Sequence, residues 1–147
     1  MSQEQEQQLR RLVTEIKMME GTAQILEQRL QLVGANISEL RLAQGSLEDL
    51  KKVEVGSNLL VPVGGGIFMN ARLGDTGRVI VGVGADVSVE MEHEAAVNDV
   101  AERLQELEKA HESAQEQLGQ ILSQLETHNR MAERLSVQIQ NALQGAK

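Results

Sequence analysis

The sequence contains no cysteine, tryptophan or tyrosine, and Phe68 and Pro62 are its only phenylalanine and its only proline. Without cysteine, the chain can form neither a disulfide framework nor a thiolate metal site. Large aromatic side chains supply much of the buried area of a compact core, so their near absence argues against an ordinary globular domain. Apolar residues still make up 41% of the chain. They are nearly all aliphatic, which suits long helices and β-branched strands.

Basic residues are also scarce relative to acidic ones. The chain has 147 residues and a formal net charge of −8. Because an acidic surface repels phosphate backbones, we expect no nucleic-acid partner. No stretch approaches the ~18 apolar residues of a candidate membrane span, and residues 1–6 lack the basic and apolar regions of a secretory signal. We therefore expect a cytoplasmic protein without a membrane partner.

Two long segments repeat apolar residues in alternating steps of three and four. In the first segment the repeat consists of Leu9, Leu12, Ile16, Met19, Ala23, Leu26, Leu30, Val33, Ile37, Leu40 and, after the polar Gln44, Leu47. In the second it consists of Val97, Val100, Leu104, Leu107, His111, Ala114, Leu118, Ile121, Leu125, His128, Ala132, Leu135, Ile139 and Ala142. A repeat sustained over this many heptads is typical of a coiled coil.

Two such stripes of similar length, joined by a compact segment, pair most economically with each other in antiparallel directions. Each helix would be roughly 75 Å long, too long for the interior of a globular domain of this size. We therefore predict one domain over residues 1–147, with helices over 1–53 and 94–147 around an insert over 57–91. The alternative, in which each helix pairs with a helix of another chain, stays open.

The middle segment changes from helical to strand periodicity. Its β-branched residues alternate in four short runs bounded by glycines, a pattern typical of strands in hairpins. Pro62 has no amide donor, so its strand is expected to lie at a sheet edge or to begin at that point. The predicted fold class is mainly α with a β-insert: a long antiparallel two-helix coiled-coil hairpin with two β-hairpins at its bend.

The insert is too small to close a core by itself. A lone hairpin is marginally stable in water, and open strand edges invite pairing with other chains. We therefore predict that the strands mediate assembly. The predicted assembly residues are Leu60, Val61, Val63, Ile67, Phe68, Met69, Val79, Ile80, Val81, Val87 and Val89.

The histidines of the second segment do not form a metal site. His111 and His128 lie roughly 25 Å apart along one helix, so they cannot bind the same metal ion, and polar seam residues that fix the register are the simpler interpretation. Because their cations would be desolvated there, we expect the seam to weaken at mildly acidic pH.

The glycines at 64–66 and 82–84 match neither a P-loop nor a GxGxxG motif. We expect no catalytic residue, metal site or cofactor, and hence no enzyme.

Apolar residues also occur outside the two seams, and Met18, Ile25 and Leu32 recur every seven residues. One interpretation is that they widen the core-facing stripe or touch a neighbouring subunit. The other is an exposed strip for transient contact with other proteins, to which flexible methionine is suited. Fraying of the terminal turns would add seam residues to such a strip. The predicted contact residues are Leu9, Leu12, Val13, Met18, Ile25, Leu32, Met131, Val137, Ile139 and Leu143.

The insert also resembles a known family. Its runs Leu60–Gly66, Ala71–Leu73, Val79–Gly84 and Val87–Glu90, followed by Glu94–Ala96, resemble the central signature of prefoldin alpha-class subunits. Phe68 stands where that family often has an aromatic residue. The resemblance covers the whole chain, but the insert carries its specificity, because heptads alone resemble many unrelated proteins.

The resemblance implies a hetero-hexamer of two alpha and four beta prefoldin subunits, in which the β-hairpins form a double β-barrel that carries six coiled-coil arms. It implies that the tips of these arms hold unfolded client proteins without ATP and deliver them to a group II chaperonin. It implies no cofactor. The alternative is a structural or tethering coiled-coil subunit that binds no unfolded protein.

Overall fold

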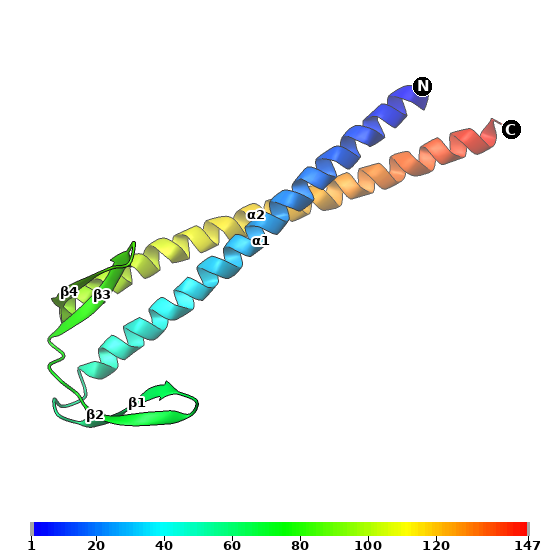
Figure 1. Cartoon of the computed structure of the whole chain (residues 1–147). Coiled ribbons are helices and arrows are strands. Elements are labelled where there is room, and N and C mark those ends of the chain that lie inside the picture. The colour runs from blue at the N-terminus through cyan, green and yellow to red at the C-terminus, as the bar shows by residue number, and fades with distance from the viewer. Residues whose placement is uncertain (1, 147) are drawn as a thin grey trace. The chain divides into compact units, whose positions relative to one another are not determined.

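The computed structural model describes residues 2–146, which form two long helices with four strands between them (Figure 1). The elements in chain order are α1 (Ser2–Leu50), β1 (Asn58–Gly64), β2 (Ile67–Arg72), β3 (Arg78–Gly84), β4 (Val87–Glu92) and α2 (His93–Gly145). The predicted fold class is confirmed. The chain divides into a terminal unit, Met1–Gly34 with Lys109–Lys147, and a hairpin unit, Ala35–Glu108. The organisation of residues 1–147 as one domain stays a prediction.

In the terminal unit the predicted seam forms between α1 and α2 of the same chain. Its buried residues are Leu12, Ala23 and Leu26 of α1 and Ala114, Leu125 and Leu135 of α2. The two helices run antiparallel here, because Leu12 lines a groove with Leu135, whereas a Cβ on Gly34 would lie 3.9 Å from Nε2 of His111. The seam ends before its last predicted position: Ala142 is exposed, because a single methyl group near a helix end covers little of its surroundings.

The hairpin unit has the same antiparallel packing. Ile37 of α1 and Val100 and Leu104 of α2 are buried, and Ala96 has no exposed surface at all. Beside this seam the guanidinium of Arg41 lies 2.9 Å from the carboxylate of Glu108. Exposed ion pairs of this kind contribute at most ~1 kcal/mol, whereas burial contributes about 25 cal/mol per Å² of apolar surface. The stability of the helix pair therefore comes mainly from the aliphatic seam.

The junction between the last strand and α2 is held by His93. Its side chain is buried, and its Nε2 lies 2.7 Å from the carbonyl oxygen of Leu47, in the last turn of α1. The last carbonyls of a helix have no partner within the helix, so the imidazole N–H that points at Leu47 satisfies one of them. The backbone N–H of His93 donates to the carbonyl of Gly77 at 2.9 Å. One residue thus links the end of α1, the start of β3 and the start of α2.

Replacing His93 with alanine is expected to lower the free energy of unfolding by about 2–3 kcal/mol. The change leaves the partly buried carbonyl of Leu47 without its side-chain partner, which costs about 1–3 kcal/mol, and it removes a buried ring. Urea unfolding of the isolated chain, followed by circular dichroism, measures the loss. Asn98→Ala is the matched control, because Asn98 is exposed on the first turns of α2 and its loss should cost less than about 0.5 kcal/mol. An unfolding midpoint of His93→Ala equal to that of the control would contradict this role.

The two β-hairpins are structural copies of each other, offset by twenty residues. In the first, Asn58 pairs with Arg72, and the register shifts between Pro62 and Gly64. In the second, Arg78 pairs with Glu92, and the register shifts between Gly82 and Gly84. Each hairpin forms a separate two-stranded antiparallel sheet. The chain therefore offers two equivalent strand pairs, a repeat that strand periodicity alone does not show.

The turns of the two hairpins require the left-handed backbone region. Gly65 and Gly66 have φ values of 58° and 76°, and Ala85 and Asp86 take the equivalent places with φ values of 50° and 58°. Two successive residues at positive φ give a turn whose twist matches that of the strands, and for a residue with a Cβ this conformation costs about 1–2 kcal/mol. The glycines at 64–66 are thus explained by turn geometry.

The structure also decides between the two alternatives for Pro62. Every strand of a two-stranded sheet is an edge strand, which confirms that the strand of Pro62 lies at a sheet edge. The second, a strand that begins at Pro62, is wrong, because β1 already begins at Asn58.

Candidate functional site

Three apolar side chains form a stripe on the outer face of α1 in the terminal unit. Met18, Ile25 and Leu32 are 70%, 66% and 70% exposed. Residues seven apart lie almost above one another, because an α-helix drifts only about 20° per heptad. Because its side chains are exposed, this outer stripe does not widen the seam within the chain. Two interpretations of the stripe remain: contact with a neighbouring subunit, and transient contact with other proteins.

The other predicted contact residues differ in how accessible they are. Val13, Met131, Val137 and Leu143 are exposed, whereas Leu12 is buried in the seam, and Leu9 and Ile139 are half-buried. All ten predicted residues belong to the terminal unit. Seven of them are accessible without any rearrangement, and the three seam residues become accessible only if the end turns of the helices separate.

An open groove lies between the helices of the terminal unit. Its lining consists of Gln8, Arg11, Leu12, Glu15, Met131, Arg134, Leu135 and Gln138. The lining combines aliphatic side chains with charged and amide groups, and it includes Met131 beside the buried Leu12 and Leu135. Such a surface can hold an apolar side chain of another protein, with polar groups nearby to hydrogen-bond its backbone.

Among the exposed aliphatic side chains of the two helices, sequence analysis missed two. Leu122 is 47% exposed in the terminal unit, and Leu42 is 73% exposed in the hairpin unit. Both could have been found, because each is an apolar residue that the three-four repeat does not use. Leu122 adds to the accessible apolar surface of the terminal unit, whereas Leu42 belongs to the hairpin unit.

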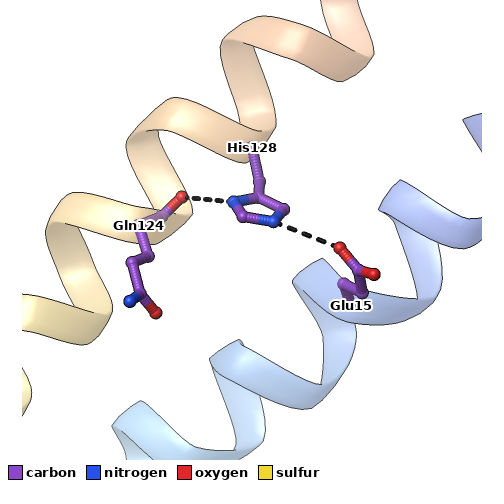
Figure 2. Close-up of polar contacts among 3 residues, drawn as sticks. All are labelled: Glu15, Gln124 and His128. Carbon is purple, nitrogen blue, oxygen red and sulfur yellow. Dashed lines mark hydrogen bonds and ion pairs between the residues drawn. The ribbon is translucent and has the colours of Figure 1, made fainter.

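The imidazole of His128 bridges α2 and α1 in the terminal unit (Figure 2). Its Nδ1 lies 2.9 Å from the carbonyl oxygen of Gln124, and its Nε2 lies 3.1 Å from a carboxylate oxygen of Glu15. Both partners are acceptors, so a neutral imidazole with its single N–H can satisfy only one of them, whereas the cation can donate to both. The imidazole is only partly buried, and the expectation that the seam weakens at mildly acidic pH stays a prediction.

In the hairpin unit the predicted assembly residues are largely accessible. Leu60, Val61, Val63, Ile67, Phe68, Met69, Ile80, Val87 and Val89 are exposed. Val79 and Val81 are half-buried, because one face of β3 is partly covered within the chain. Two small sheets with exposed aliphatic side chains and open edges are marginal in water, so they are suited to pairing with strands of other chains.

Two searches of the described residues bear on other kinds of site. Residues 2–146 contain no group of three or more His, Cys, Asp or Glu side chains placed to hold a metal ion. In the same part of the chain, no helix is long and apolar enough to cross a membrane.

The accessible features are thus an apolar terminal unit and two open-edged hairpins, the features of a subunit that works through protein contacts. The prefoldin subunit family matches residues 19–138. Prefoldin subunit alpha of Methanopyrus kandleri is 39% identical over 108 residues, which cover 74% of this chain and 69% of that protein. Prefoldin subunit alpha of Pyrococcus horikoshii is 34% identical over 104 residues, which cover 70% of each.

A solved structure shows the same fold. A chain of the filamentous prefoldin from Methanocaldococcus jannaschii, determined by cryo-EM, superposes with a TM-score of 0.65 at 22% identity, covering 76% of this chain and 93% of that one. The chain belongs to the prefoldin subunit family, and its relatives are alpha subunits. Members of this family are chaperone subunits and not enzymes, so the chain is a chaperone subunit.

Proposed function

We propose that the chain is the alpha subunit of a cytoplasmic prefoldin hetero-hexamer, two alpha and four beta subunits, that holds unfolded client proteins without ATP and passes them to a group II chaperonin. The observation that carries the proposal is the collection of exposed aliphatic side chains in the terminal unit, with the outer stripe of Met18, Ile25 and Leu32 as its most accessible part. Unfolded proteins differ from folded ones in exposing apolar side chains, and such a surface can bind them.

The size of each contact explains how a client could be released without nucleotide. Burial of one aliphatic side chain contributes at most ~1.5–3 kcal/mol, so a single residue holds a client only briefly. Several arms that act together raise the effective concentration of binding surface and hold the client more tightly than any one arm. Because every individual contact breaks easily, the client can move stepwise to an acceptor with a larger apolar surface.

The open strand edges of the two hairpins also support this proposal. Multivalent holding needs several arms on one body, and the two hairpins offer the strand edges through which such a body can form. We propose a double β-barrel built from the hairpins of this chain and of beta subunits. Delivery to a group II chaperonin rests on the family resemblance alone.

The test is an aggregation assay with the chain, its partner beta subunit and a chemically denatured client, in the absence of nucleotide. We expect the complex to suppress aggregation, and we expect added ATP and magnesium to leave the suppression unchanged. In calorimetric titration, ATP and magnesium should give no heat beyond the heat of dilution. A complex that forms but leaves aggregation unchanged would instead indicate a tethering coiled coil. Saturable ATP binding at micromolar concentrations would contradict the nucleotide-independent mechanism.

A further inference from the structure

The hydrogen bonds at the hairpin ends establish which backbone groups of β3 face outward. In an antiparallel ladder, pairs that exchange hydrogen bonds alternate with pairs that do not. His93 donates its N–H to Gly77, which makes these two residues a bonded pair. The register runs without interruption from Arg78 to Gly82, so Gly82 falls in a non-bonded pair. Its N–H and C=O therefore point away from β4, toward the open edge of β3.

The same counting places Pro62 at the open edge of β1. The N–H of Leu73 donates to the carbonyl of Ser57 at 2.9 Å, and the register continues unbroken to the pair of Pro62 with Phe68. Pro62 is thus also in a non-bonded pair and costs the hairpin no ladder hydrogen bond. What is missing is a donor on the outer edge, where a further strand would need one.

At the equivalent position of the second hairpin, Gly82, a side chain hydrogen-bonds to the outward carbonyl. Nη1 of Arg103, on α2, donates to the carbonyl oxygen of Gly82 at 3.0 Å. Nε of Arg103 forms an ion pair at 2.9 Å with Oδ2 of Asp99, one turn earlier on the same helix. That oxygen is buried and outside regular hydrogen-bond geometry, so the pair acts as a charge contact that holds the guanidinium against the strand edge.

We propose that Pro62 and the Arg103–Gly82 contact are two stops, which limit how far a strand of another prefoldin subunit can pair along β1 and β3. Such a strand can bond to the outward groups of Asn58 and Leu60, or of Arg78 and Ile80. At the next outward position, Pro62 offers it no donor, and the carbonyl of Gly82 is already engaged by Arg103. Within residues 2–146, no side chain hydrogen-bonds to the outward backbone groups of β2 or β4. Strands of other subunits would therefore pair along only part of β1 and β3 but along the full length of β2 and β4. This difference staggers the strands, and closure of a β-barrel requires such a stagger. The inference rests on the proposed strand-mediated assembly.

Amide hydrogen exchange, resolved by residue in the complex with beta subunits and in the isolated chain, tests the stops. On assembly, the outward amides of Leu60 and Ile80 should exchange about tenfold more slowly, because they gain hydrogen-bond partners. The outward amide of Gly82 should exchange at the same rate in both states. Protection of Gly82 in the complex would overturn the stop at β3. Unchanged exchange at all outward amides would refute strand-mediated assembly itself, a different outcome from protection of Gly82.

Two variants test the cause of each stop. In the complex, Arg103→Ala should allow pairing to extend, so that the amide of Gly82 gains about tenfold protection. Pro62→Val restores an outward amide, which should be protected to a similar extent. Lys109→Ala is the matched control on α2, since Lys109 is an exposed cation, and it should leave the exchange pattern unchanged. An unprotected amide at residue 62 or 82 in its variant would show that the stop lies elsewhere and would overturn the proposal for that strand.

Discussion

Replacement of residues 57–91 by a short Gly/Ser loop is expected to abolish assembly and to leave a helical monomer. The helix seam buries its apolar residues within the chain, whereas the hairpins expose theirs together with four open strand edges. Strand pairing supplies backbone hydrogen bonds along each edge, and no other described part of the chain offers an array of unpaired backbone groups of this kind. Light scattering of the mixture with beta subunits measures the effect, and circular dichroism shows whether the helices persist.

A matched control keeps the hairpins and changes only their connection. Residues 74–77 lie between β2 and β3, so replacing them with Gly-Ser-Gly-Ser alters the linker without removing any strand. Gly77 accepts one backbone hydrogen bond, from His93, and its carbonyl is retained in this design. The control should assemble. A hexamer of full mass from the chain without its hairpins would show that assembly depends on the helices.

Changing Met18, Met131 and Leu143 together to serine is expected to reduce client holding while assembly and helicity persist. The three side chains are 70%, 52% and 63% exposed in the terminal unit, so serine at these positions leaves the seam intact. Each lost contact is worth at most ~1.5–3 kcal/mol, and alpha arms share the client with beta arms, so we expect about tenfold more complex to be needed for the same suppression of aggregation.

The chain offers a matched control for this triple variant. Leu42, Val53 and Val55 are 73%, 43% and 66% exposed and belong to the hairpin unit. Changing them to serine removes a similar amount of exposed apolar surface from a different part of the chain, and holding should stay within about twofold of the unmodified complex. Equal activity of both variants would move the client site away from the terminal unit. Equal loss in both would indicate that any exposed aliphatic residue contributes, wherever it lies.

Much of the fold was determined by the sequence itself, because the relevant signals are local. Residues three and four apart fall on one face of a helix, so the repeat from Leu9 to Leu47 is enough to identify the buried face of α1. Alternation of β-branched residues and the position of glycines identify the four strands and their turns in the same way. The exposed positions of Met18, Ile25 and Leu32 also follow, since they lie off that face.

Only the tertiary structure decided which groups from distant parts of the chain meet. His128 faces Glu15, and Arg103 faces the carbonyl of Gly82, although neither pair is encoded by a repeat or a motif. His93 has the sequence context of an ordinary first helical residue, yet it is buried and bonded to Leu47. Periodicity determines the face of an element on which a residue lies. The partner of that residue depends on the register between elements, which is set by the packing of the whole seam and by backbone groups that carry no sequence signal.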